Sequence, residues 1–380
     1  MRLQYFFFYL FVSLANSAST QTKGPPKAFT RHIIAIGDLH GDLKAAQDVL
    51  QLAGVTDESN NWSGDVDILV QTGDIIDRGP DATEIFQLME KLRRQADSHS
   101  GTVVSLLGNH EWMNILGDWR YVPSKEMNTD KVIKERQHLL TKGWLGQAWK
   151  NYYKSAVRLP LHPSVGDTSG GTRYSPVTSS SGALSHSAIS FVHGGLSPTF
   201  RCLLPFPTHI NSLSDTLLKR AFNQDPQPTP YPPARSFPQL DGTTSNECQL
   251  TADDGPLWYR DWALNSEKEV CAKVDAVLKN TGTRRMVMGH TIQEVTEITA
   301  RCDGKILLID TGMSSAYNDG KTGLLSALSI YYTLSPIGRS ANPKTQRWKE
   351  HEVISAFYAD EEEITMIDET REVAGDFSVS

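Results

Sequence analysis

Short apolar runs that end near glycine and a polar residue recur along the chain. The clearest are Ile33–Ile36 before Gly37-Asp38, Ile68–Val70 before Gly73-Asp74, and Val103–Leu107 before Gly108-Asn109. Later runs follow the same rule: Ile189–Val192 before His193, Met286–Met288 before Gly289-His290, and Ile306–Ile309 before Asp310. Short apolar runs bounded by glycine predict buried strands. Functional sites are usually built from polar residues on loops that a rigid sheet holds in place.

Two stretches between the first strands have the spacing of amphipathic helices. In the first, one helical face carries Leu43, Ala46, Leu50 and Ala53, and Gly54 follows where a helix would end. In the second, residues 83–94, the apolar positions are Ile85, Leu88, Met89 and Leu92. Because strands and helices alternate, the sequence predicts an α/β fold.

Three other stretches break this alternation. Residues 115–161 are rich in tryptophan and tyrosine, with helical spacing from Val132 to Leu140, and we expect an inserted cap there. Residues 164–187 are rich in serine and glycine, which predicts a surface loop. Residues 205–238 are rich in proline and are expected to form a connection.

The N-terminus has the pattern of a secretory signal peptide. Arg2 precedes an uncharged run from Tyr5 to Leu14, and Ala15 and Ser17 supply the small residues of a cleavage site. The run is shorter than the roughly 20 residues that span a bilayer, and no second apolar run of that length follows. We therefore expect cleavage after residues 1–17 and a location in the secretory pathway: secreted, in the endoplasmic reticulum or vacuolar.

Composition narrows the class of function. The hydrophobic share of 39% and the charged share of 21% are typical of a globular chain. The net charge of −7 gives no sign of a nucleic-acid surface, so no nucleic-acid partner is expected. The four cysteines, Cys202, Cys248, Cys271 and Cys302, allow three disulfide pairings or remain free thiols. The sequence leaves the oligomeric state open.

The polar residues at the strand ends have the chemistry of a metal centre. Asp38 and His40 lie two positions apart, so their side chains point the same way on an extended segment. Asp74 follows Asp38 by 36 positions and precedes Asn109 by 35, long enough in each case for a helical crossover between parallel strands. These ligands should therefore collect at one edge of the sheet. A dinuclear site uses such oxygen and imidazole ligands, with one carboxylate able to bridge.

The same motifs carry a family resemblance. Gly37-Asp38-Leu39-His40-Gly41, Gly73–Gly79 and Gly108-Asn109-His110-Glu111 resemble the signature of the phosphoprotein phosphatases among the calcineurin-like metallophosphoesterases. The run from Trp112 to Val122 resembles the Shewanella-like branch. The resemblance covers residues 30–320 and implies a catalytic domain built as a β-sandwich flanked by helices in four αββα layers. Residues 321–380 would then form an extension that completes or flanks the sheet.

The resemblance also implies roles for individual residues. One metal would be held by Asp38, His40 and Asp74, and the second by Asp74, Asn109, His193 and His290. The ions would be manganese, iron or zinc. His110 is the candidate general acid, held by Asp77. The phosphate would be bound by Arg78, by Asn109 and by Arg260, although the spacing around Arg260 departs from the family pattern.

The predicted enzyme is a metal-dependent phosphatase in which a metal-bridging hydroxide attacks phosphate monoesters in line. Its expected substrates are phosphoproteins, at serine, threonine or tyrosine, or small phosphomonoesters. The first alternative is a hydrolase of diadenosine tetraphosphate or other nucleotides on the same fold. The others are a nucleic-acid phosphodiesterase, which the acidic charge disfavours, and a catalytically inactive binding protein, which the complete set of expected ligands disfavours.

Overall fold

The computed structural model describes residues 26–168, 173–176, 182–224, 240, 242–293, 297–321, 323–359 and 361–378. The expected signal peptide at residues 1–17 lies outside the described residues, as does much of the serine-rich loop and of the proline-rich connection. Within the described part of the chain, no helix is both long and apolar enough to cross a membrane.

Seven strands form the first sheet, in the order β12-β11-β10-β1-β2-β3-β4. Their bounds are β1 Phe29–Ile36, β2 Ile68–Gln71, β3 Thr102–Leu106, β4 Tyr153–Lys154, β10 Ser326–Ile337, β11 Arg347–Tyr358 and β12 Ile364–Ala374. β1, β2 and β3 run parallel, whereas β10, β11 and β12 form an antiparallel ribbon on the other side of β1. The carboxyl ends of β1, β2 and β3 therefore lie at one edge.

Five strands form the second sheet, in the order β5-β6-β7-β9-β8. Their bounds are β5 Ala156–Pro160, β6 Ala188–Val192, β7 Arg285–Met288, β8 Thr299–Arg301 and β9 Ile306–Leu308. Because β6, β7 and β9 pair in parallel, their carboxyl ends also share one edge.

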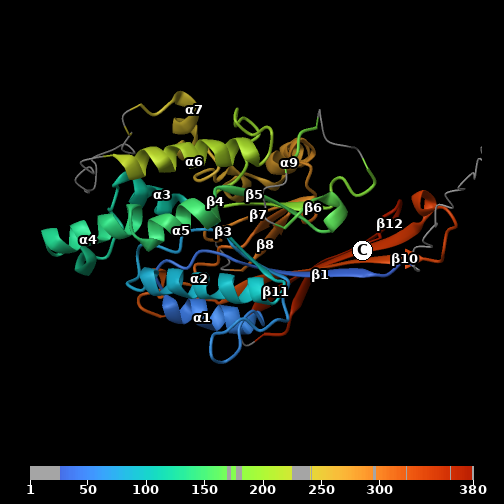
Figure 1. Ribbon diagram of the computed structural model, residues 1–380, viewed down its shortest axis with the longest axis horizontal. Helices are drawn as coiled ribbons and strands as arrows, with labels where there is room; N and C mark the ends of the chain where they lie inside the picture. The colour runs from blue at the N-terminus through green and yellow to red at the C-terminus, as the bar shows by residue number, and fades with distance from the viewer. Residues whose placement is uncertain are drawn as a thin grey trace, which may run out of the picture.

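Helices cover the outer faces of both sheets. In Figure 1, α1 and α2 lie below the strands and α6 and α9 above them, with α3, α4 and α5 at one end. The bounds are α1 Leu43–Leu52, α2 Ala82–Ser98, α3 Asn109–Leu116, α4 Asp130–Thr141, α5 Trp144–Tyr152, α6 Thr208–Asn223, α7 Ser245–Cys248, α8 Asp261–Leu264 and α9 Glu267–Thr281. The α/β class and the four-layer sandwich that the sequence predicts are thus confirmed.

Alternate residues of the central strands enter different hydrophobic cores. Ile33 and Ala35 of β1 face the core between the two sheets, whereas Ile34 and Ile36 face the helices. Phe191 of β6 enters the inter-sheet core from the opposite side. Each large apolar side chain buried in this way stabilises the fold by about 1.5–3 kcal/mol. Burial on both faces explains why these strands appear in the sequence as continuous apolar runs.

Both helices expected from the spacing of apolar residues are present. α1 begins after Asp42, whose carboxylate accepts a hydrogen bond from the Ala45 amide at 3.0 Å. It ends before Gly54, which has a φ of 68°. α2 extends the expected residues 83–94 to Ala82–Ser98.

The stretches after residue 115 contain several elements whose positions the sequence does not predict. Within residues 205–238 the structure has α6, a helix that prolines before and after it obscured in the sequence. Residues 115–161 contain α4, near the expected helical stretch, but also α5 and β5, which belong to the body of the sandwich. Residues 321–380 carry β10, β11 and β12, which lengthen the first sheet.

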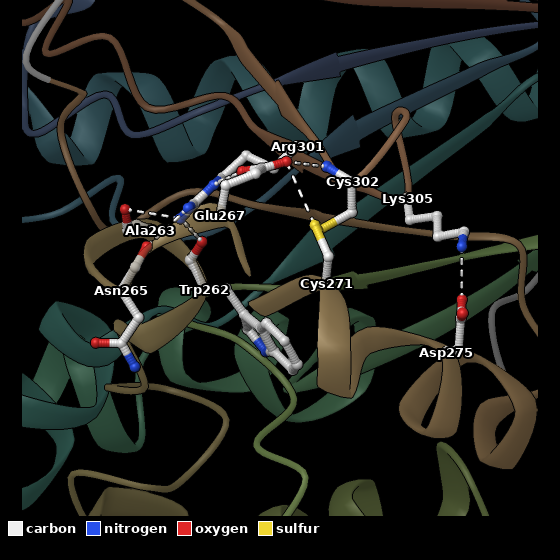
Figure 2. Close-up of a disulfide and its surroundings, with 9 residues drawn as sticks. All are labelled: Trp262, Ala263, Asn265, Glu267, Cys271, Asp275, Arg301, Cys302 and Lys305. Atoms are coloured by element: carbon white, nitrogen blue, oxygen red, sulfur yellow. Dashed lines mark hydrogen bonds and ion pairs between the residues drawn. A yellow bond between two sulfur atoms is a disulfide. The ribbon is translucent and has the colours of Figure 1, made fainter. Parts of the chain in front are cut away.

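A disulfide joins Cys271 near the start of α9 to Cys302 in the β8–β9 turn, whereas Cys202 and Cys248 are free thiols. Figure 2 shows Arg301 beside this bond, donating to the backbone carbonyls of Trp262, Ala263 and Asn265. The bond and the arginine together fasten the β8–β9 hairpin to the segment around α8.

We expect loss of this disulfide to destabilise the protein. Closing a loop across 31 positions restricts the unfolded chain, so Cys271→Ser should lower the free energy of unfolding by about 2–4 kcal/mol. Urea unfolding measures the change, and reductant should lower the wild-type stability by a similar amount. Cys248→Ser, which removes a free thiol, serves as the control. An unchanged midpoint in Cys271→Ser would contradict the prediction.

Candidate metal centre

Six strand ends from both sheets meet at one place. Asp38 and His40 follow β1, Asp74 follows β2, and Asn109 begins α3 after β3; His193 follows β6, His290 follows β7, and Asp310 follows β9. The side chains of all seven are buried. The sequence predicts ligands at the edge of one sheet, whereas in the structure both sheets contribute ligands to that edge.

The backbone at this place adopts conformations that most residues avoid. Of the ten non-glycine residues with positive φ in the described part of the chain, five are site residues: His40, Asp74, Asp77, Arg78 and His290. Such a conformation costs about 1–3 kcal/mol per residue and persists only where the surroundings enforce it. The surrounding structure therefore holds these loops in strained conformations, and those conformations fix the directions of the side chains.

Two glycines make the close packing possible. A Cβ atom on Gly108 would lie 2.2 Å from Asp74 Oδ1, and one on Gly289 would lie 2.3 Å from Asp38 Oδ1. Any side chain at either position would displace a candidate metal ligand. This explains why glycine precedes Asn109 and His290 in the motifs.

In each of three histidines, one ring nitrogen forms a hydrogen bond with a backbone carbonyl oxygen and the other faces the site. His40 Nδ1 lies 3.2 Å from the carbonyl oxygen of Ile76, and His193 Nδ1 lies 2.9 Å from that of Thr72. His290 Nε2 lies 3.3 Å from the Trp258 carbonyl oxygen. A backbone carbonyl accepts a hydrogen bond, so the nearer ring nitrogen carries the hydrogen and the other nitrogen carries a lone pair. This is the arrangement of metal-binding histidines.

Burial keeps two of these rings neutral. Burial, with His110 nearby, lowers the pKa of His40 to about 3. Burial and His193 lower the pKa of His290 well below its ordinary value. Neutral imidazole is the form that binds a metal ion.

Asp74 is the common neighbour of the histidines. Its Oδ2 atom lies 3.3 Å from His193 Nε2, 3.6 Å from His40 Nε2 and 3.9 Å from His110 Nε2. The ligand atoms form two groups that share Asp74: one with His40 and His110, the other with His193 and His290. This sharing is what a bridging carboxylate requires.

The donor set fits two cations. His193 Nε2, with its lone pair, lies 2.8 Å from Asn109 Oδ1, which is also an acceptor. Burial raises the pKa of Asp38 well above its usual range, and the carboxylates of Asp310 and Asp74 raise it further. Among the described residues, neither Asp38 nor Asp74 forms a salt bridge with lysine or arginine. Converging acceptors and unpaired buried carboxylates are satisfied by positive charge.

His110 lies beside this cluster and is held from behind. Its Nδ1 atom lies 2.8 Å from Asp77 Oδ2. Although burial opposes it, the carboxylates of Asp74 and Asp77 raise the pKa of His110 above its ordinary value. The Asp77 side chain is fully buried. The pair therefore has the geometry of a proton donor oriented by a carboxylate.

Two arginines flank the cluster. The Arg78 guanidinium lies over the Tyr121 ring, 4.0 Å from its centroid, and 5.2 Å from that of Tyr317. The Tyr317 ring in turn meets His40 edge to face. Arg260 Nη1 donates to the carbonyl oxygen of His290 at 2.8 Å and to Thr291 Oγ1 at 3.0 Å. The structure thus brings together every residue that the sequence singles out; their chemical roles stay predictions.

Glu111 is the last residue of a motif, but its role is not predicted from the sequence. Its buried carboxylate accepts hydrogen bonds from the backbone amides of Asp74, Ile75, Ile76 and Gly108 at 2.7–3.1 Å. Burial, with Asp74 nearby, raises the pKa of Glu111 to about 7. Glu111 fixes the loop that carries Asp74 to the start of α3. The signal in the sequence was its position three residues after Gly108, as in a helix-capping box.

Comparison with known proteins agrees with this geometry. Residues 31–294 match the model of the calcineurin-like phosphoesterases. The chain therefore belongs to this family, whose fold and cluster of buried aspartates and histidines it shares.

The branch within the family follows from individual relatives. An uncharacterised protein of Schizosaccharomyces pombe is 34% identical over 75% of this chain and 74% of its own. Shewanella-like protein phosphatase 1 of Plasmodium berghei is 29% identical over 76% of this chain and 69% of its own length. A solved structure of the cold-active protein-tyrosine phosphatase of a psychrophilic Shewanella covers 89% of this chain and 80% of that one, at 21% identity and a TM-score of 0.58. The resemblance to the Shewanella-like branch is confirmed.

A substitution at Asp74 tests the metal centre. Because an amide cannot bridge two ions as a carboxylate does, Asp74→Asn should lower the bound metal from two ions towards none. Mass spectrometry of the purified protein measures the metal content. Asp118→Asn is the matched control, since Asp118 is also buried but pairs with Arg120. Full retention of two ions in Asp74→Asn would remove the bridging assignment.

Proposed function

We propose that this protein is a metal-dependent protein phosphatase that hydrolyses phosphate monoesters. The observation that carries the proposal is the position of the His110–Asp77 pair directly beside the buried ligand cluster centred on Asp74. A centre that only stabilised the fold would have no use for a proton donor at its edge. This arrangement also favours an enzyme over an inactive binding protein.

The proposed ligands divide as the two groups around Asp74 indicate. Following the family resemblance, Asp38 and His40 would complete one site and Asn109, His193 and His290 the other, with Asp74, which belongs to both groups of ligand atoms, shared. His110, also in the first group, is proposed as the proton donor instead, because its Nδ1 atom is engaged by Asp77. When bound, two such ions supply an activated water as nucleophile and neutralise charge on the phosphoryl group. Their identity, manganese, iron or zinc, is open because availability as well as affinity decides which metal is loaded.

The protein's own groups would complete the reaction. The leaving oxygen needs a proton, and His110 Nε2 faces the cluster while Nδ1 is engaged by Asp77. Arg78 lies between the rings of Tyr121 and Tyr317, which limit its movement and leave its planar fork for two phosphate oxygens. Asn109 is proposed both as a ligand and as a phosphate contact.

The proposed substrates are phosphoproteins. Support comes from the printed names of the relatives, a Shewanella-like protein phosphatase and a protein-tyrosine phosphatase. Turnover by the purified, manganese-loaded protein should be measured on peptides carrying phosphoserine, phosphothreonine or phosphotyrosine and on diadenosine tetraphosphate. We expect the phosphopeptides to be hydrolysed at higher kcat/KM. A preference for the dinucleotide would instead establish the nucleotide hydrolase.

Loss of the proposed proton donor should depend on the leaving group. His110→Ala should lower kcat on phenyl phosphate by about 10²–10⁴-fold, as removal of a general acid does. The loss should be much smaller on 2,4-dinitrophenyl phosphate, whose leaving group departs without a proton. Equal losses on the two substrates, with metal content unchanged, would refute the role.

The two arginines should act on the phosphoryl group. Arg78→Ala should lower kcat by about 10²–10³-fold if its contribution resembles that of one oxyanion donor, with two metal ions retained. Arg78→Lys should recover only part of the loss, because a point charge cannot bind two oxygens in parallel. Arg260→Ala should behave in the same way. Arg371→Ala is the control, because Arg371 is a half-buried arginine on β12 that pairs with Glu369 and not with a site residue. Wild-type kinetics in Arg260→Ala would exclude that residue from the site.

A further inference from the structure

The carboxylate of Asp77 is engaged on both oxygens. Oδ2 faces His110 Nδ1, and Oδ1 accepts a hydrogen bond from Asn114 Nδ2 at 2.8 Å. Asn114 lies on α3, one helical turn after His110, and its Nδ2 also donates to the His110 carbonyl oxygen at 2.9 Å. The amide group of Asn114 therefore holds both members of the proposed proton-donor pair.

The orientation of that amide is set by an arginine from another helix. Arg136 on α4 donates from Nη2 to Asn114 Oδ1 at 2.7 Å. An arginine offers only hydrogen-bond donors, so Arg136 can donate to the oxygen of the amide but cannot bond to its nitrogen. With Oδ1 bound to Arg136, Nδ2 must face Asp77. If the amide flipped, its oxygen would face the Asp77 carboxylate and repel it.

Arg136 is itself fixed in place and cannot touch a substrate. Its side chain is 7% exposed, its Nη1 pairs with Glu126, and its guanidinium lies over the Trp119 ring at 5.2 Å. Its Nη2 also lies 3.7 Å from Asp77 Oδ1, so its charge reaches the carboxylate directly. Any effect of Arg136 on the reaction must therefore pass through Asp77 and Asn114.

This arrangement is poor as a purely stabilising device. Burying an arginine–glutamate pair gives up hydration that the ion pair often fails to recover, and apolar residues of similar size can pack as well. The Nε atom of Arg136 is also buried without a hydrogen-bond partner among the described residues. Such an unpaired donor costs stability. A positioning function would explain why the group is present.

We propose that Arg136 is a positioning residue for the proton donor: through Asn114 it orients Asp77, and thereby His110, towards the leaving oxygen. This rests on the proposed function. The stretch at residues 115–161 would then do more than cover the site, because its helix α4 would set the geometry of the catalytic pair. Loss of the partners that orient metal-binding side chains typically costs about 10–100-fold in metal affinity or activity, and we expect a loss of the same order here.

The experiment compares two aryl phosphates in Arg136→Gln. On phenyl phosphate, kcat should fall by about 10–100-fold, while on 2,4-dinitrophenyl phosphate it should change little, with two metal ions retained. Arg136→Lys keeps the charge but cannot reach Asn114 and Glu126 together, so it should show the same dependence with a smaller loss. It also carries the test should Arg136→Gln fail to fold. Arg158→Gln is the matched control, because Arg158 is also buried but bonds to the backbone at Gly282 and Ser185.

A double-mutant cycle decides whether Arg136 works through His110. If it does, His110→Ala with Arg136→Gln should be no slower on phenyl phosphate than His110→Ala alone. Additive losses, or equal losses on both aryl phosphates, would overturn the proposal. A wild-type protein that binds two metals yet hydrolyses neither aryl phosphate would instead refute the proposed function, so the two failures are distinguishable.

Discussion

The Asp74 carboxylate can lie beside three candidate histidine ligands only because two separate sheets hold those histidines around it. His40 comes from the first sheet and His193 and His290 from the second, so their spacing depends on how the sheets pack. The inter-sheet core, with Ile33 and Ala35 on one side and Phe191 on the other, sets that packing. Because a close-packed interior transmits small displacements, the geometry of the metal centre is a property of the whole sandwich.

The loops at this edge adopt backbone conformations that are unfavourable for their residues. Left-handed backbone at His40, Asp74, Asp77, Arg78 and His290 costs about 1–3 kcal/mol per residue. Glu111 offsets part of this, because four backbone amides donate hydrogen bonds to its buried carboxyl group and a typical hydrogen bond contributes about 0.5–1.5 kcal/mol to stability. A single buried glutamate thus stabilises the loop that presents the shared ligand.

Outside the ligands, the segment after the third motif supplies a second set of contacts. Tyr121 packs on Arg78 and its carbonyl oxygen accepts a hydrogen bond from the Arg78 amide at 3.0 Å. Asn114 donates a hydrogen bond to Asp77, and Arg136 Nη2 lies 3.7 Å from Asp77 Oδ1. From the sequence alone, this region is expected to be only a cap. In the structure it also supports Arg78 and the proton-donor pair.

Local patterns in the sequence determined much of this protein. Apolar runs buried on both faces predicted β1, β2 and β3, and the motifs that follow them named the residues of the site, because strand ends and turn glycines leave a local trace. What only the tertiary structure decided were contacts between distant segments: the Cys271–Cys302 pair, α6 between proline-rich stretches, the backbone role of Glu111 and the approach of Arg136 to Asp77. Arg136 follows Asp77 by 59 positions, and nothing in the spacing of the chain links them. The packing of α4 against α3 brings them together, and such packing is a property of the folded core that no short stretch of sequence encodes.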